Sequence, residues 1–293
     1  MSLEEARVLV LGAGFSGRAI ARLLAGQGAQ VTGTSRTAEK AALLQNDGVR
    51  PVVYSGGITP ALEVELKETT HLIVSIAPDE TGDAVLNDLR AAGLSKLPRL
   101  QGISYLSTVG VYGDHGGAWV DETTECQPTS RRSHQRLAAE IGWQRFADEA
   151  SAALTILRLS GIYGPGRNAF VNLQNGTAKR IVKPGQIFNR IHVDDIAGAA
   201  AHLITAGQHG IFNVTDSEPA PPQDVVTLAA SLMGVEPPPQ IPYDEAQMTP
   251  MARSFYAETK RVSNARLLNT GYRMRYPSYR EALRSIWDSG RWQ

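Results

Sequence analysis

Short runs of apolar residues alternate with amphipathic stretches along the first two thirds of the chain. Each run is almost continuously apolar, which is typical of strands that are covered on both faces. Between most runs, apolar residues recur at the spacing of one helix face, as Ala19, Ile20, Leu23 and Leu24 do. The strand candidates are residues 7–11, 30–33, 50–54, 71–76, 102–107, 154–159 and 211–214. The helix candidates are residues 15–27, 38–46, 79–92, 131–150 and 195–205.

This alternation predicts an α/β fold of the Rossmann type, with a doubly wound parallel sheet. The pattern changes after Leu159, where a glycine-rich stretch is followed by two proline-rich ones and by one more helix candidate at residues 279–287. We expect these pieces to form a small C-terminal lobe over the carboxyl edge of the sheet, with a ligand cleft between them. The predicted domains are residues 1–160 plus 190–217 for the sheet and residues 161–189 plus 218–293 for the lobe.

Composition narrows the class of protein further. The 293 residues are 42% hydrophobic, and 29 basic side chains balance 29 acidic ones, which indicates a globular chain without the basic field that nucleic acids attract. One cysteine, Cys126, and six scattered histidines exclude a disulfide framework and predict no metal cluster. We see no apolar run long enough to span a membrane and no signal peptide, so we expect a cytoplasmic protein.

A glycine motif lies between the first strand candidate and the first helix candidate. Residues 12–17 read G-A-G-F-S-G, which is G-x-G-x-x-G in the context that gives this motif its meaning. Gly12 permits the tight turn, Gly14 lets a pyrophosphate approach the backbone, and Gly17 allows close packing of helix on strand. The first helical turn, with Phe15 and Ser16, supplies free N–H groups for the phosphates. The motif predicts dinucleotide binding; the alternative is a simple connecting turn.

The end of the second strand candidate indicates which dinucleotide binds. NAD sites usually carry an acidic residue there, which binds the ribose 2′-hydroxyl. This chain has Thr34, Ser35 and Arg36 instead. Two hydroxyls and a guanidinium suit a 2′-phosphate, so we predict NADP as the cofactor, with NAD as the second choice. The alternative reading of Arg36 is a solvated surface side chain.

Several segments together resemble the extended short-chain dehydrogenase/reductase family, the NAD-dependent epimerase/dehydratase-like proteins. The matching segments are residues 10–17, S-T-V-G-V-Y-G at 107–113, Asp121-Glu122 with Pro128, residues 157–166 ending in I-Y-G-P-G, and H-V-D-D-I-A at 192–197. The resemblance covers almost the whole chain. It implies a nicotinamide cofactor, a small-molecule substrate bound between the lobes, and a cofactor site that also includes Ser75, Thr108 and Gly161.

The chain departs from the family pattern at two places. Leu11 replaces the first glycine of the family's loop, and the catalytic Y-x-x-x-K that the family carries on its active-site helix is absent. Counting back from the segment that ends at Glu140 puts Arg132 at the tyrosine position and Arg136 at the lysine position. The chain therefore resembles an atypical, YeeZ-like subgroup. Arginine stays protonated and cannot replace tyrosine as acid or base, but it can donate hydrogen bonds to an anion.

The resemblance leaves five candidate catalytic residues: Thr108, Tyr112, Arg132, Arg136 and Tyr163. Thr108 would orient the substrate oxygen, or merely cap the loop after its strand. The two arginines would face the cleft and favour an anionic substrate; the alternative is a surface pair of Arg136 with Glu140. Either tyrosine would supply a phenol, or only pack.

Three other reactive side chains are better explained by structure than by chemistry. His134 is two residues from each of the two helix arginines, which places it on a different face. His192 precedes Asp194, the expected helix cap, and is interpreted as a structural histidine. Cys126 lies in a polar loop without a His–Asp arrangement to activate it.

Two functions follow from these residues. The first is an NADP-dependent oxidoreductase or epimerase-like enzyme for a small polar, anionic or sugar-derived substrate. The second is an NADP(H)-binding sensor or regulator that has lost catalysis. The family commonly dimerises through the two helices beside the central strand, so a homodimer is expected, with Ile141, Trp143 and Phe146 as apolar contacts or as core residues.

Overall fold

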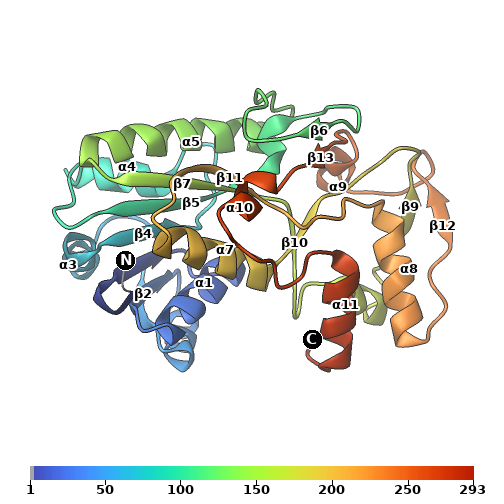
Figure 1. The fold of residues 1–293 in the computed structure, drawn as a ribbon, viewed down its shortest axis with the longest axis horizontal. Coiled ribbons are helices and arrows are strands. Elements are labelled where there is room, and N and C mark those ends of the chain that lie inside the picture. The colour runs from blue at the N-terminus through green and yellow to red at the C-terminus, as the bar shows by residue number, and fades with distance from the viewer. Residues whose placement is uncertain (1–2) are drawn as a thin grey trace.

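Seven parallel strands form the central sheet of the protein, which is described by a computed structural model over residues 3–293 (Figure 1). Their order across the sheet is β11-β7-β5-β4-β1-β2-β3, and every neighbouring pair is parallel. The strands are β1 (Arg7–Leu11), β2 (Gln30–Ser35), β3 (Arg50–Val53), β4 (His71–Val74), β5 (Gly102–Thr108), β7 (Ala153–Leu159) and β11 (Gly210–Val214). The predicted α/β, doubly wound fold is confirmed.

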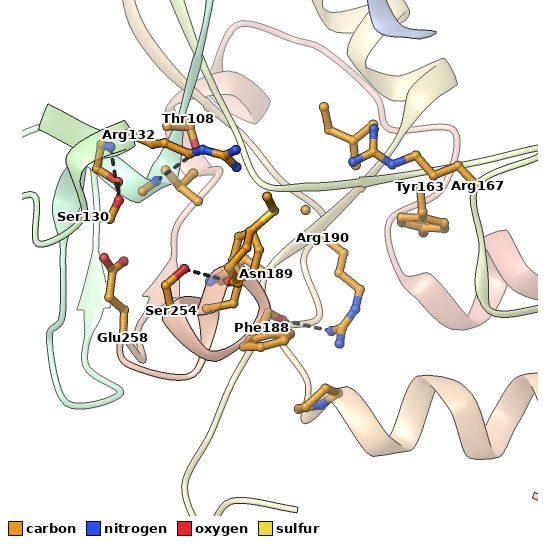
Figure 2. Close-up of a pocket in the computed structure, with 18 of the residues that line it drawn as sticks. Thr108, Ser130, Arg132, Tyr163, Arg167, Phe188, Asn189, Arg190, Ser254 and Glu258 are labelled. Carbon is orange, nitrogen blue, oxygen red and sulfur yellow. Dashed lines mark hydrogen bonds between the residues drawn. The ribbon is translucent and has the colours of Figure 1, made fainter. Parts of the chain in front are cut away.

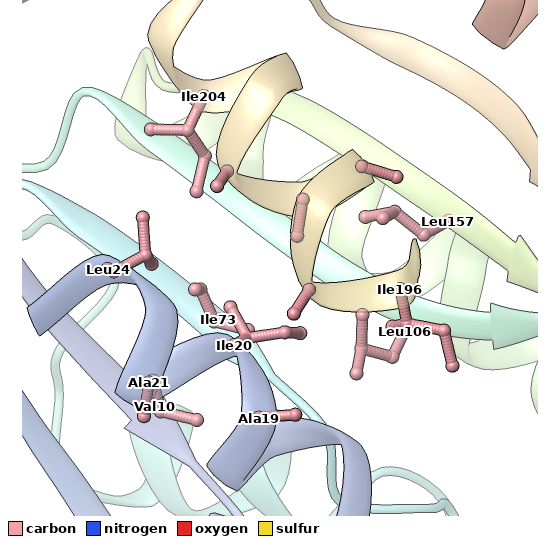
Figure 3. Close-up of a cluster of buried hydrophobic side chains, with 14 of the residues drawn as sticks. Val10, Ala19, Ile20, Ala21, Leu24, Ile73, Leu106, Leu157, Ile196 and Ile204 are labelled. Atoms are coloured by element: carbon pink, nitrogen blue, oxygen red, sulfur yellow. The ribbon is translucent and has the colours of Figure 1, made fainter. Parts of the chain in front are cut away.

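Helices cover both faces of this sheet, as the continuous apolar character of the strands requires. Successive residues of a strand point to opposite faces. Val8 and Val10 of β1 therefore pack under α1 (Phe15–Gly26) and α7 (Val193–Thr205), as Figure 3 shows for Val10. Leu9 and Leu11 pack into a second core on the opposite face. The helices on that face are α3 (Pro60–Glu68), α4 (Ala84–Ala91) and α5 (Arg131–Ala150).

A smaller lobe lies beyond the carboxyl edge of the sheet, on the right in Figure 1. Phe170, Tyr279 and Leu283 are fully or almost fully buried in its core. Two short parallel sheets pair β8 with β10 and β9 with β12. The elements are β8 (Gly161–Tyr163), α6 (Ala169–Gln174), β9 (Arg180–Val182), β10 (Arg190–His192), α8 (Pro222–Met233), β12 (Gln240–Pro242), α9 (Pro250–Phe255) and α11 (Tyr279–Asp288).

The chain returns to the larger domain before it ends. β13 (Arg261–Val262) pairs with β6 (Trp119–Val120), and α10 (Ala265–Asn269) packs against β11. This part of the chain therefore lies with the sheet domain, whereas the sequence-based boundaries assign it to the lobe.

Several element boundaries differ from the expected ones for local reasons. The expected helix at 79–92 begins only at Ala84, because Asp83 caps it and the Asp79 carboxylate holds Thr81 in a turn. The expected helix at 38–46 is α2 (Ala38–Ala42) followed by a 3₁₀ segment (Leu43–Asp47). Short 3₁₀ segments also occur at Leu3–Glu5 and Val109–Tyr112.

Five helices, α3, α6, α8, α9 and α10, were not predicted from the sequence. Three of them, α3, α8 and α9, have proline in the first turn, a position that tolerates proline because its N–H has no helical partner. The proline-rich stretch before α8 therefore both separates two elements and starts a helix. Within residues 3–293, none of the helices combines the length and the apolar character that crossing a bilayer requires.

Candidate functional site

The glycine turn between β1 and α1 is built so that only glycine fits at two of its positions. Gly12 has a φ of +91°, and a Cβ there would lie 2.7 Å from Cγ1 of Ile76. A Cβ on Gly17 would lie 2.4 Å from the carbonyl oxygen of Gly12. Any side chain at these positions would push the turn away from the helix, so both glycines set the shape of the turn.

Gly14 has a different surrounding. A Cβ built on it meets nothing within 4 Å, so the chain itself does not require glycine there. Gly14 also begins α1 without a side-chain cap, which leaves the N–H groups of the first helical turn, including those of Phe15 and Ser16, for a ligand. An open backbone beside an uncapped helix N-terminus fits a pyrophosphate, and the residues present therefore fit a bound dinucleotide.

The three residues at the end of β2 that were predicted to bind the adenosine part of the cofactor differ in their burial. Thr34 is buried, its hydroxyl accepts a hydrogen bond from the Gly12 N–H, and its carbonyl accepts one from Ala13. The structure therefore does not support the prediction that the Thr34 hydroxyl binds a 2′-phosphate, because the side chain is buried and its oxygen holds the glycine turn. Ser35 is half-buried and Arg36 is exposed, so these two remain the candidates.

Two of the three other expected cofactor residues, Ser75 and Gly161, come just after strands of the central sheet, β4 and β7 respectively. Ser75 follows β4, and its backbone N–H donates to the carbonyl of Leu11. Its Cβ packs 3.3 Å from where a side chain on Gly17 would begin, which places it against the glycine turn. Gly161 opens β8 and lines the cleft between the lobes. Both roles stay predictions.

A cleft of about 1180 Å³ separates the sheet from the smaller lobe. Four of the predicted catalytic residues line it, namely Thr108, Arg132, Arg136 and Tyr163. Figure 2 shows the guanidinium groups of Arg132 and Arg167 pointing into this cleft from opposite sides. The Thr108 hydroxyl accepts a hydrogen bond from Gly110, so Thr108 caps its loop and also faces the cleft.

The two arginines on α5 differ in how firmly they are held. Arg136 donates through Nη1 to the Leu106 carbonyl at 2.7 Å and to the Tyr105 hydroxyl at 3.1 Å. No carboxylate pairs with either Arg132 or Arg136 within the described residues 3–293. Arg136 is thus a fixed cation in the cleft wall, and Arg132 is an exposed one.

Glu140 does not form the expected surface pair with Arg136. It is buried and accepts from Arg158 through Nη2 at 2.7 Å and Nε at 3.2 Å. The Ser107 hydroxyl also donates to it. The hypothesis of an Arg136–Glu140 surface pair is therefore wrong, because the helix turns Glu140 inward onto β5 and β7.

Tyr112 is not at the cleft. Its ring is fully buried under the Arg158 guanidinium, 4.9 Å from the ring centre, and its hydroxyl donates to Asn213 Oδ1 at 2.7 Å. Burial raises the pKa of its phenol to about 12. The structure therefore does not support Tyr112 as a catalytic phenol; it is a packing residue.

Tyr163 does line the cleft. Its hydroxyl is buried without a hydrogen-bond partner among the described residues, and its ring lies edge-on to His192 at 5.4 Å. Burial raises the pKa of the phenol well above its usual value; the charge of Asp216 adds to this rise, and that of Arg190 opposes it. Tyr163 therefore keeps its proton at neutral pH and is a weaker acid than an exposed phenol.

The three side chains expected to be structural are placed accordingly. His192 is buried, and burial lowers its pKa to about 4. Its Nδ1 accepts from the Asp194 N–H, so His192 caps α7, and the prediction of Asp194 as the cap is wrong by two residues. His134 is exposed on α5, and burial raises the pKa of the half-buried Cys126 thiol.

Comparison with known proteins identifies the family. A model of the NAD dependent epimerase/dehydratase family matches residues 8–215. The chain belongs to this family. A nicotinamide dinucleotide is the cofactor typical of the family, which agrees with the fit at the glycine turn.

Two individual relatives cover most of the chain, and a third covers half of it. A solved structure from Silicibacter pomeroyi DSS, described as a functionally unknown conserved protein, is 43% identical with a TM-score of 0.88, covering 97% of this chain and 98% of that one. Protein YeeZ of Escherichia coli is 28% identical over 267 residues, which is 79% of this chain and 85% of YeeZ. A Streptomyces protein named 3-diazoavenalumate denitrifying reductase is 28% identical over 163 residues, half of this chain and 51% of that protein.

The cleft of this family member contains charged residues that the sequence analysis missed. The cleft is lined by Arg167 and Arg190 of the lobe and by Glu258 and Lys260. The last two belong to the C-terminal return, which is the segment at residues 258–269 that leads back to the sheet domain. No short motif marks them, because distant segments of the chain bring them together. Only the fold places these residues opposite α5.

One spacing near the C-terminus resembles the missing motif without forming it. Tyr256 and Lys260 are four residues apart, but the chain between them is not helical. Tyr256 is buried against Phe188 and Tyr243, whereas the Lys260 ammonium bonds to Glu258 at 2.8 Å. The two side chains therefore do not act as a Tyr/Lys pair.

Proposed function

We propose that this family member is an NADP(H)-dependent oxidoreductase or epimerase-like enzyme that acts on a small anionic substrate without the usual Tyr/Lys pair. The observation that carries the proposal is the cationic cleft beside the glycine turn. Arg132 and Arg167 reach into it from opposite sides, and neither has a carboxylate partner within residues 3–293. Two unpaired cations across a cleft repel each other unless an anion lies between them.

The residues that line the cleft support one assignment of catalytic roles. Bound NADP(H) supplies or accepts the hydride. Thr108 orients a substrate oxygen, and Arg132 and Arg136 donate hydrogen bonds to an anionic group or to negative charge that develops on that oxygen. Neither arginine releases a proton, because guanidinium stays charged at any working pH. Tyr163 lines the same cleft, and its phenol is the proposed proton relay to the substrate oxygen, a role that requires its raised pKa to fall when cofactor and substrate bind. The reductase name of the Streptomyces relative supports redox chemistry.

The preference for NADP rests on the end of β2. Ser35 and the exposed Arg36 offer a hydroxyl and a guanidinium, and no acidic residue is present there to bind a ribose 2′-hydroxyl. We expect Arg36→Ala to weaken NADPH binding about tenfold to a hundredfold, since a hydrogen bond to a charged group contributes roughly 1.5–3 kcal/mol. NADH binding should change little. Calorimetry with both coenzymes measures the difference.

Arg22 provides a matched control for this variant. It is also an exposed arginine, on α1, and it ends no strand at the cofactor edge. Arg22→Ala should leave both affinities unchanged. Equal losses of NADPH and NADH affinity in Arg36→Ala would remove the assignment of Arg36 to the 2′-phosphate.

A second function, that of a cofactor-binding sensor, is favoured by one observation. Arg132 and Arg136 occupy the counted positions of the family's Tyr and Lys, so the usual proton transfer is missing. The two functions differ in turnover of a panel of aldehydes, ketones and nucleotide sugars. We expect NADPH oxidation with at least one of them, falling by about tenfold or more in Thr108→Ala. NADPH binding without any turnover would favour the sensor.

The homodimer also stays a proposal, with fewer contact residues than the three that the sequence suggests. Trp143 and Phe146 are buried in the core of one chain, so they are not interface residues. Ile141 is half exposed on α5 and is the apolar residue of the three that a partner would cover.

A further inference from the structure

The walls of the cleft differ in chemical character between its two ends. Arg132, Arg136 and Arg167 lie at the end next to the sheet domain. Apolar side chains of α8 and α11 lie at the end within the smaller lobe, where the Arg190 guanidinium already donates to the Phe188 and Ala220 carbonyls and lies 5.8 Å from the centre of the Tyr279 ring. From this geometry we infer that the substrate is a carboxylic acid with an apolar body, held by its carboxylate at the arginine end and by its hydrocarbon or aromatic part in the lobe. The inference rests on the proposed function and specifies its substrate.

Among the described residues, no carboxylate forms an ion pair with Arg132 or Arg167, although the Asp79 carboxylate also lines the cleft. Two other cations in the cleft wall have carboxylate partners: Arg131 pairs with Glu80 at 2.9 Å and Lys260 with Glu258 at 2.8 Å. Arg132 and Arg167 have none among the described residues. The guanidinium of Arg167 lies over the Phe15 ring, 5.8 Å from its centre. A planar guanidinium matches a carboxylate with two parallel hydrogen bonds, so these two are the expected anion ligands.

The lobe end offers apolar surface. Val225 and Val226 of α8 and Leu283 of α11 line it. Met251 and Phe255 of α9 also line the cleft, and they are 52% and 61% exposed, unusually high for large apolar side chains. Apolar surface gathered in a cleft is typical of a site where a ligand's apolar part is removed from water.

Several polar side chains along the cleft are already engaged within the protein, which leaves few of them for a nucleotide sugar; one exception at the lobe end is the Tyr279 hydroxyl of α11, which is buried without a partner among the described residues. The Asn168 amide donates to Gly164 and Trp292 carbonyls and accepts from Val171. Asn189 bonds to the backbone of the C-terminal return through both its amide atoms, and the Ser254 hydroxyl donates to the Met251 carbonyl. A base and a sugar ring need several free donors and acceptors, since a buried polar group without a partner is costly.

Binding to the NADPH-saturated protein tests the inference without requiring turnover. The probes are a series of straight-chain and aryl carboxylates, each paired with its primary amide, together with acetate and UDP-glucose. We expect the best carboxylate to bind at least tenfold more tightly than its amide, and more tightly than acetate or UDP-glucose. Arg132→Gln and Arg167→Gln should each remove most of the preference for carboxylate over amide, and Val226→Asn should weaken the carboxylate and its amide alike.

Arg145→Gln is the matched control, because Arg145 is an exposed arginine of the same helix and lies outside the cleft. It should leave every affinity unchanged. If no carboxylate binds more tightly than its amide, or if UDP-glucose binds most tightly, the inference is overturned. NADPH affinity is measured first, by titration of the coenzyme-free protein: absence of NADPH binding would refute the proposed function, whereas normal NADPH binding with no carboxylate preference would refute the substrate class alone.

Discussion

Replacing Gly14 by alanine should leave the fold unchanged and weaken NADPH binding about tenfold to a hundredfold. A Cβ at this position meets nothing within 4 Å in the protein, so the melting temperature should stay that of the wild type. The same Cβ would stand where a pyrophosphate approaches the backbone at the start of α1, and would lengthen hydrogen bonds to a charged group, each contributing roughly 1.5–3 kcal/mol. Thermal unfolding and calorimetry on one preparation measure both quantities.

Alanine variants of two other glycines serve as controls for Gly14→Ala. Gly26 lies at the far end of α1, and a Cβ there also meets nothing within 4 Å. Gly26→Ala should keep coenzyme binding and stabilise the protein by up to about 1 kcal/mol, as alanine favours a helix over glycine. Gly17→Ala should lose both stability and binding, because its Cβ would lie 2.4 Å from the Gly12 carbonyl. Wild-type NADPH affinity in Gly14→Ala would contradict phosphate binding at this turn.

Of all these variants, Glu140→Ala should lower the free energy of unfolding the most. Glu140 and Arg158 are each 3% exposed and are joined by two hydrogen bonds. Glu140→Ala leaves the Arg158 charge buried without its counterion and leaves the Ser107 hydroxyl without its acceptor. Breaking such a pair from one side costs about 3–5 kcal/mol. Urea unfolding of the variant and of the wild type gives the difference in the free energy of unfolding.

A double variant separates the buried charge from the lost packing. Glu140→Leu combined with Arg158→Met removes both charges and keeps similar volumes, so it should recover most of the loss. A single Glu140→Ala variant that loses less than about 1 kcal/mol would show that Arg158 reaches another counterion or water.

The sheet was predictable because its strands are buried on both faces. A strand such as β1, R-V-L-V-L, has apolar residues in both alternating sets, and residues 8–10 are almost fully buried in the structure. The glycine turn was predictable for a related reason: Gly12 and Gly17 are required by contacts with their near neighbours in sequence and across one strand. Local chemistry of this kind is visible in a short stretch of residues.

Long-range contacts could not be predicted in the same way. Glu140 and Arg136 are one helical turn apart, so a surface pair was a reasonable expectation, but the partner that Glu140 uses lies on β7. Tyr112 follows its strand just as a cleft residue would, yet the 3₁₀ turn at Val109–Tyr112 directs its ring into the core. In both cases the choice depends on which face of the element meets the sheet.

The smaller lobe was the least predictable part of the molecule. Its helix α8 begins at a proline that reads as a helix breaker, and its short strands pair with segments far away in sequence. Arg167 and Arg190 reach the cleft only because this lobe folds over the edge of the sheet. Such residues carry no periodic or motif signal of their own.

Calorimetric titration of the purified protein with NADPH and with NADH tests the central claim most directly. The account predicts binding of both coenzymes to one site per chain, with NADPH the tighter by about tenfold or more, because Arg36 contributes a charged contact to the 2′-phosphate alone. Absence of heat and of any melting shift with either coenzyme at millimolar concentration would contradict it.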